Sequence, residues 1–165
     1  MGLGLDGAAR GERRLTAMNA LIGEWTMEAV FPRDPDRVFR GGKSVFEWLK
    51  GERLLVQRST APGGEIPDSL AIVAAPPRAK TYVQHYFDSR GVVRLYQMTF
   101  RRRVWTLQRD TADFSPLDFH QRFIGKLSAD GRTIAGEWQT SADGRSWTKD
   151  FDLIYRRVGR RGTRR

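Results

Sequence analysis

Apolar and polar residues alternate along most of this chain. The stretch EWTMEAVF (24–31) has Trp, Met, Ala and Phe at every second position, and WTKDFDLIY (147–155) sets Trp, Phe, Leu and Tyr against Thr and two Asp. A period of two places successive side chains on opposite faces of a β-strand, so both stretches are predicted to be strands with one apolar face. RRLTAMNALIG (13–23) differs, because its apolar residues recur at helical spacing and Gly23 is placed to end a short helix.

Gly, Pro and Asp residues separate the alternating stretches. DSRG (88–91), ADG (129–131) and SADG (141–144) have the composition of hairpin turns in which Gly supplies a positive φ. FPRDPDRVFRGG (31–42) and APGGEIPD (61–68) are predicted to be loops, because each contains two Pro and a Gly pair. The strands predicted in this way are 24–31, 42–50, 53–60, 69–75, 80–88, 91–100, 103–109, 118–128, 132–140 and 146–156.

About ten short strands joined by tight turns are typical of an antiparallel meander. An open sheet of this size would expose two long edges, and closure removes them. The predicted fold class is therefore all-β, an up-and-down antiparallel β-barrel of about ten strands with a short N-terminal helix. Gly-Glu-Trp occurs at 23–25 and again at 136–138. At both places, a Gly would let a large aromatic ring fold into the barrel. The alternative is that the second Gly-Glu-Trp is a coincidence in a Trp-rich chain.

The barrel is expected to form one domain over residues 12–157, preceded by a disordered, Gly-rich segment at 1–11 and followed by a basic disordered tail at 158–165. The chain has 29 Lys and Arg against 19 Asp and Glu, a net charge of +10. Its last ten residues, RRVGRRGTRR, contain six of the Arg and no acid. This tail either contacts an acidic partner such as nucleic acid or keeps the terminus solvated. Because the rest of the chain has no RNA-reading motif, we favour the second reading and expect no specific nucleic acid partner.

Composition and motifs exclude several classes of function. The absence of Cys excludes disulfides, thiol catalysis and thiolate metal sites. The sequence has no Walker loop, dinucleotide fingerprint or G-x-S-x-G elbow. His85 and His120 are the only His residues, so we expect neither a metal site nor a cofactor. With no secretory signal and no apolar run long enough to span a bilayer, we expect a cytoplasmic protein without a membrane span, monomeric or homodimeric.

A short helix, the motif Gly23-Glu24-Trp25 and a meander of strands together resemble the calycin superfamily, which includes lipocalins, fatty-acid-binding proteins and nitrobindin-like barrels. The segments FEWLKGERLLVQR (46–58), YFDSRGVVRLYQM (86–98) and SADGRSWTKDFDLIYRR (141–157) are similar to an uncharacterised bacterial lipocalin-like family. The resemblance covers roughly residues 15–157 and implies the fold more than any activity, since one fold serves many functions.

The resemblance also implies a role for one aromatic residue and bears on one cofactor. In calycins the Trp of the Gly-x-Trp motif caps one end of the barrel, often beneath an Arg from the last strand, and here Trp25 with Arg156 or Arg157 matches. Nitrobindins bind haem through a His on the C-terminal strand. The corresponding stretch SWTKDFDLIYRR (146–157) has no His, so haem is not expected.

Turn lengths predict which side chains share the barrel interior. We take 50–52 and 89–91 as three-residue loops and centre a third turn on 101–102. The resulting pairs include Tyr86 with Arg94, Gln84 with Tyr96, Met98 with Trp105, and Trp48 with Leu54. The face that they place together, which we predict to bind a ligand, comprises Phe46, Trp48, Gln84, Tyr86, Arg94, Tyr96, Met98, Trp105 and Arg109.

On this face Arg94 and Arg109 are expected to bind an anionic or carbonyl head group while the aromatic residues hold an apolar body. A shift of one residue in the register would invert the assignment. The opposite face would then line the interior and the two Arg would be solvated. The residues of that face are Val83, His85, Phe87, Val93 and Leu95.

Three functions remain open from the sequence. We favour a carrier or sensor that binds a small apolar or amphipathic molecule. The first alternative is a cyclase- or isomerase-like enzyme in which Tyr96, Glu47 or His120 transfers a proton, His120 being two residues from Asp118 on a strand. The second is a non-catalytic interaction protein whose barrel is packed solid and whose basic tail finds an acidic partner.

Overall fold

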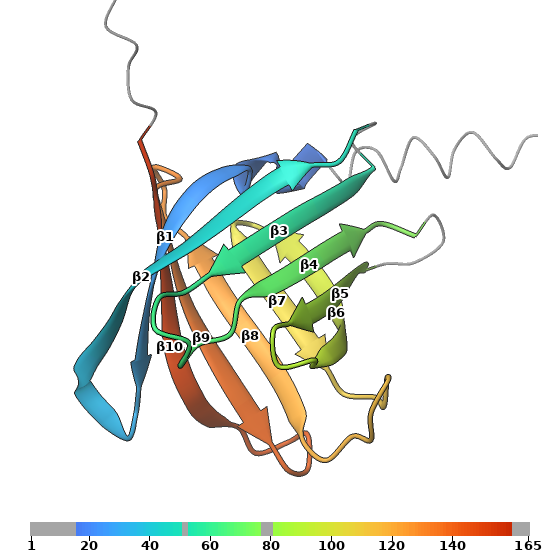
Figure 1. Ribbon diagram of the computed structural model, residues 1–165. Helices are drawn as coiled ribbons and strands as arrows, with labels where there is room; N and C mark the ends of the chain where they lie inside the picture. The colour runs from blue at the N-terminus through green and yellow to red at the C-terminus, as the bar shows by residue number, and fades with distance from the viewer. Residues whose placement is uncertain (1–15, 51–52, 77–80, 160–165) are drawn as a thin grey trace, which may run out of the picture.

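The computed structural model describes residues 16–50, 53–76 and 81–159, which form a closed barrel of ten antiparallel strands (Figure 1). Each strand pairs with its neighbours in chain order, and β1 pairs with β10 to close the ring. The all-β fold class, the antiparallel meander and its closure are therefore confirmed. Residues 160–165 of the predicted tail at 158–165, and the predicted segment at 1–11, lie outside the described residues.

The predicted strand positions agree closely with the observed ones. Nine of the ten strands begin and end within a few residues of the predicted bounds. The strands are β1 (Gly23–Phe31), β2 (Asp34–Trp48), β3 (Leu54–Thr60), β4 (Ser69–Ala74), β5 (Tyr82–Asp88), β6 (Val93–Arg101), β7 (Val104–Arg109), β8 (His120–Leu127), β9 (Thr133–Ser141) and β10 (Thr148–Arg157).

The exception is β2, which begins at Asp34 although residues 31–42 were predicted to be a loop. Residues 34–42 pair only with β1, since pairing of β2 with β3 starts at Lys43. This part of β2 is thus an edge, and an edge strand tolerates Pro35 because one row of its N–H groups needs no partner. The register between β1 and β2 also shifts at two places, between Met27 and Ala29 and between Val30 and Phe31.

Of the four pairs named above, the two across the 89–91 turn are confirmed, since Tyr86 lies opposite Arg94 and Gln84 opposite Tyr96. The other two are wrong. Met98 pairs with Leu107, because the turn after β6 is centred on 102–103, one residue further along than predicted, which moves each partner by two residues. Trp48 pairs with Leu55 rather than Leu54, and the Leu49 N–H donates to the Leu54 carbonyl, which makes this loop one residue longer.

A short helical turn lies across one end of the barrel, at the top of Figure 1. Within the described residues it is a 3-10 turn, η1 (Ala17–Ala20), and the start of the predicted helix lies outside them. Its residue Met18 and the following Leu21 are fully buried. The turn therefore closes this end, which we call the closed end. None of the helical residues in the described part belongs to a helix long and apolar enough to cross a membrane.

Trp25 and Arg157 hold the closed end together, as the resemblance implied. The Trp25 indole N–H donates to the Leu21 carbonyl at 2.8 Å, and the Arg157 guanidinium lies over the indole ring at 4.1 Å from its centroid. Arg157 also donates to the carbonyls of Ala20 and Ile22. One cation thus binds the carbonyl of the last residue of η1 and that of Ile22, which follows it, and stacks on the indole ring.

Aromatic rings fill the barrel next to the closed end. Trp105 packs against Phe123 with ring centroids 4.9 Å apart and against Phe46 at 5.7 Å. Two glycines make room for Phe123: a Cβ on Gly136 would lie 2.4 Å from its ring and 2.8 Å from the Leu153 carbonyl, and one on Gly125 would lie 2.7 Å from the ring. The glycine of the second Gly-Glu-Trp is therefore required by packing against a large ring.

We expect Gly136→Ala to lower the free energy of unfolding by about 1–3 kcal/mol, because the added methyl group overpacks the core against a ring and a backbone carbonyl. Urea denaturation followed by Trp fluorescence measures the change. Gly159→Ala is the control, since a Cβ there meets only Arg132 at 4.0 Å, and its effect should stay within about 0.5 kcal/mol. Equal stability of the two variants would contradict the tight packing described for Phe123.

Candidate functional site

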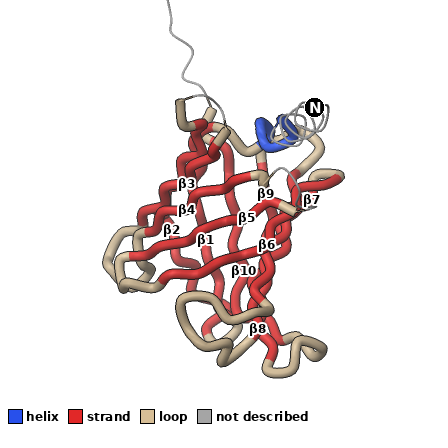
Figure 2. The backbone as a smooth tube through the Cα atoms, turned by 90° about the vertical axis from the view of Figure 1, so that its right-hand side faces the viewer, coloured by secondary structure: helices blue, strands red, loops and turns tan. Residues whose placement is uncertain are grey.

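The barrel encloses a cavity of about 610 Å³ between the aromatic core and the end opposite η1. Exposed residues at that end contribute to its lining, among them Arg40 on β2 and, in the loops, Glu65, Arg90 and Phe119, so the cavity opens there. We call this opening the mouth. Figure 2 shows the helical turn at one end of the barrel and long loops at the other.

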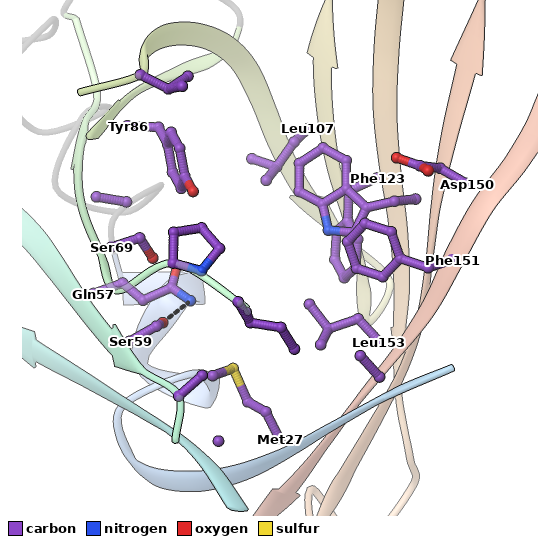
Figure 3. Close-up of a pocket in the computed structure, with 18 of the residues that line it drawn as sticks. Met27, Gln57, Ser59, Ser69, Tyr86, Leu107, Phe123, Asp150, Phe151 and Leu153 are labelled. Carbon is purple, nitrogen blue, oxygen red and sulfur yellow. Dashed lines mark hydrogen bonds between the residues drawn. The ribbon is translucent and has the colours of Figure 1, made fainter. Parts of the chain in front are cut away.

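Two walls of different chemistry face each other across the cavity, as Figure 3 shows. Strands β3 to β6 carry a polar wall, and strands β7 to β10 carry an aromatic wall. The polar wall consists of Gln57, Ser59, Ser69, Gln84, Tyr86 and Arg94. The aromatic wall consists of Leu107, Phe123, Trp138, Phe151 and Leu153, with Trp105 and Tyr155 also among the lining residues.

Hydrogen bonds fix part of the polar wall. The Gln57 amide donates to Ser44 Oγ at 3.1 Å and to Ser59 Oγ at 3.3 Å, and the two Ser hydroxyls lie 3.0 Å apart. Gln84 is only 3% exposed, yet its Oε1 has no hydrogen-bond partner. The Trp105 indole N–H is likewise buried without a partner. A buried polar group without a hydrogen-bond partner costs about 1–3 kcal/mol. Two lining residues, Gln84 and Trp105, thus have unused hydrogen-bonding capacity.

Two tyrosines add neutral hydroxyl groups. Tyr86 donates to Asp88 at 3.1 Å, and Tyr96 donates to Gln121 at 2.7 Å. Burial raises the pKa of both hydroxyls, so both remain protonated at neutral pH. They can act as hydrogen-bonding groups toward a ligand, whereas neither is an ionised base.

Arg109 is on the inward face of β7 with Trp105 and Leu107, but it is not among the residues that line the cavity. Its side chain is 1% exposed and pairs with Asp113, with Nε at 2.8 Å from Oδ2 and Nη2 at 3.0 Å from Oδ1. Nη2 also donates to the Pro116 carbonyl at 3.0 Å, and Asp113 accepts from the Leu95 N–H on β6. The bidentate pair therefore anchors the β7–β8 loop and leaves Arg109 with no charge to offer a ligand.

Arg94 does line the cavity. It is half-buried and donates to Ser115 Oγ at 2.7 Å and to the Val93 carbonyl at 3.1 Å, both through Nη1. Within the described part of the chain no carboxylate forms an ion pair with it. Its remaining N–H groups can therefore donate to an acceptor on a ligand.

The nine residues predicted to bind a ligand separate into two groups. Those that line the cavity are Gln84, Tyr86, Arg94, Tyr96 and Trp105. Of the others, Phe46 and Met98 belong to the buried core, Trp48 donates to Asn19 next to η1 at 2.7 Å, and Arg109 holds a loop. Whether the five lining residues contact a ligand stays a prediction.

The prediction missed part of the lining, notably Asp150 beside Phe151 on β10. Strict alternation places Asp150 on the outer face, but the register between β9 and β10 shifts between Lys149 and Phe151. Such a bulge leaves no signal in the alternation itself, since Asp and Lys residues on an exposed face look the same with or without it.

The His residues do not contribute to the cavity lining. The His120 ring packs on Gly144, and its Nδ1 is buried without a hydrogen-bond partner, so Asp118 does not bond to that nitrogen. Among the described residues no cluster of three or more His, Cys, Asp or Glu could hold a metal ion. The described residues that line the cavity therefore include no imidazole.

Comparison with known proteins supports the fold and leaves the activity open. No protein-family model and no curated protein matches the chain. The barrel is similar to the crystal structure of Rv2717c from M. tuberculosis, with a TM-score of 0.57 and 15% sequence identity. The match covers 88% of this chain and 98% of that chain. At this identity, the similarity shows a shared barrel fold alone.

The Arg109–Asp113 pair predicts how stability depends on pH. Hydrogen bonds from Arg109 hold the pKa of Asp113 well below its usual range. Asp113 therefore stabilises the fold fully above about pH 4, and this contribution is lost as the pH falls toward its folded pKa. We expect Asp113→Asn to cost about 3 kcal/mol at pH 7, because it leaves a buried Arg without its partner.

The difference between wild type and Asp113→Asn should shrink by about 1.4 kcal/mol per pH unit below about pH 4. Urea denaturation between pH 7 and pH 3 measures both proteins. Asp36→Asn, on the exposed part of the β1–β2 hairpin, is the control and should match wild type at pH 7. A difference that stayed constant over this pH range would show that the pair does not stabilise the fold through the Asp113 charge.

Proposed function

We propose that this protein is a carrier or sensor that holds one small apolar or amphipathic molecule inside its barrel. The cavity of about 610 Å³ carries the proposal, because it lies within the range of small-molecule pockets and combines aromatic side chains with a few polar groups. The alternative of a solidly packed barrel has less support, because residues of all ten strands line this space.

Arg94 is our candidate for the group that recognises an anionic or carbonyl function on the ligand. The contacts around Arg94 leave N–H donors available, whereas Arg109 is paired with Asp113. The proposed head-group site therefore consists of Arg94 with its neighbour Tyr86 across the β5–β6 pair. The apolar body of the ligand would lie against the aromatic wall.

A proton-transfer enzyme has less support from the same geometry. Glu47 is exposed and forms an ion pair with Arg58 on the outside of the barrel. His120 is absent from the cavity lining. Of the three residues that the sequence suggested for a proton step, Tyr96 alone faces the cavity, and its hydroxyl is bonded to Gln121.

Membership of the calycin superfamily belongs to the same proposal. Its support is the closed meander of ten strands, the stacking of Arg157 on Trp25 at the closed end, and the fold similarity to Rv2717c. A calycin relationship agrees with a binding role, and native mass spectrometry of protein purified from its own host would identify a molecule that co-purifies with it.

Filling the cavity should abolish binding. Ala71 is a buried lining residue on β4, so we expect Ala71→Trp to weaken the binding of N-phenyl-1-naphthylamine, a neutral fluorescent probe, at least tenfold. Fluorescence titration measures the affinity, and circular dichroism checks the fold. Ala135→Trp, on the exposed side of β9, is the matched control and should bind as wild type does. Probe binding that is unaffected by Ala71→Trp would place the probe outside the barrel.

The proposed role of Arg94 is tested by comparing an anionic probe with the neutral one. We expect Arg94→Gln to weaken 1-anilinonaphthalene-8-sulfonate by about tenfold, or about 1.4 kcal/mol, while N-phenyl-1-naphthylamine changes little because it lacks the sulfonate. Arg101→Gln, at the exposed far end of the same strand, removes the same charge without touching the cavity. If both variants weaken the anionic probe equally, the effect comes from net charge and Arg94 is not the head-group site.

A further inference from the structure

A β-bulge on β10 turns an acidic side chain into the cavity. Lys149 pairs with Gln139 and Phe151 with Trp138, so Asp150 is an extra residue with no partner on β9. A bulge of this kind redirects a side chain that strict alternation would place on the other face. Asp150 and Phe151 accordingly both line the cavity, although they are adjacent in sequence.

The acids and bases around the bulge are otherwise paired with each other. Lys149 lies outside, 2.9 Å from Asp152 and 3.0 Å from Glu137. Glu65, the other acid in the lining, pairs with Arg37 at 2.8 Å. Asp150 takes no part in these pairs.

Within the described residues, the Asp150 carboxylate has neither a hydrogen bond nor an ion pair. Burial raises the pKa of its carboxyl, and the positive charge of Arg33 in the β1–β2 turn opposes this. A partly buried carboxylate without a donor is costly, and a ligand that supplies a donor removes the cost.

Aromatic rings line the cavity on the same side. Phe31 packs on Phe39 with centroids 5.3 Å apart and on Phe151 at 5.0 Å, and Trp138 stacks on Phe151 at 6.4 Å. Figure 3 shows the Asp150 carboxylate on the same side of the cavity as Phe151. The electron-rich faces of such rings attract cations, and a nearby carboxylate adds to this attraction.

We propose that Asp150 and this aromatic cluster bind a basic nitrogen of the ligand, whose N–H donates to the Asp150 carboxylate. This inference rests on the proposed function and specifies its ligand. Arg94 on β6 and Asp150 on β10 lie four strands apart around the ring, so the two charges face the cavity from different walls. The ligand class is therefore an apolar or aromatic molecule with an acceptor group on one side and a protonated amine on the other, and a simple fatty acid lacks the second group.

Two probes with one aromatic body test the proposal. 1-Naphthylmethylamine is protonated at neutral pH, whereas 1-naphthalenemethanol is uncharged and nearly the same size. Their affinities are measured at pH 7 by displacement of N-phenyl-1-naphthylamine, for wild type, Asp150→Asn and Asp152→Asn. Asp152 is the matched control, because it lies two residues away on β10 with its carboxylate held by Lys149.

We expect wild type to prefer the amine over the alcohol by about tenfold, which corresponds to about 1.4 kcal/mol. Asp150→Asn should remove this preference by weakening the amine while the alcohol binds as before, and Asp152→Asn should keep it. Unchanged alcohol binding also shows that Asp150→Asn leaves the barrel folded.

Three results would overturn the inference. If the alcohol binds and the preference for the amine survives in Asp150→Asn, the carboxylate does not recognise the nitrogen and the proposed function stands. If Asp152→Asn loses the preference as completely as Asp150→Asn, the effect is one of net charge. If neither probe nor N-phenyl-1-naphthylamine binds to wild type, the proposed function fails and this inference fails with it.

Discussion

Six residue pairs, from Trp25 with Arg157 to Val30 with Asp152, join the first strand to the last. This pairing closes the sheet into a ring along these six pairs and turns one face into an enclosed interior. The stacking of Arg157 on Trp25 secures the same seam, since the guanidinium also binds carbonyls beside the helical turn. Both the aromatic core and the cavity exist because this seam is closed.

The interior is divided along its length into a packed part and a hollow part. Near η1, Trp105, Phe123 and Phe46 fill the barrel. The Phe123 ring fits against the sheet because Gly136 has no side chain. Toward the mouth the inward residues on β3 to β6 are smaller or polar, for example Ser59 and Ser69, and they leave space. Rigidity at one end thus supports an opening at the other, which is the arrangement that a binding site held by a stable scaffold requires.

Much of the fold was readable from the sequence, because alternation and turn residues are local signals. The turn at 88–91 fixed the β5–β6 register and with it the inward position of Gln84, Tyr86 and Arg94. The predictions were wrong where the same local sequence pattern is compatible with two different structures. Pro35 suggested a loop but lies in an edge strand, and the bulge at Asp150 reversed the expected face. Arg109 faces inward as its register implied, yet its partner Asp113 comes from a loop whose path no alternation pattern encodes.

The seam between β1 and β10 also decides where the described chain leaves the barrel. Because Trp25 lies opposite Arg157, the start of β1 and the finish of β10 emerge together beside η1, and the mouth faces the other way (Figure 1). A tether attached before β1 or after β10 therefore orients every molecule with its opening toward solution. For a protein fixed to a sensor surface, either attachment point would keep the interior reachable by a dissolved compound.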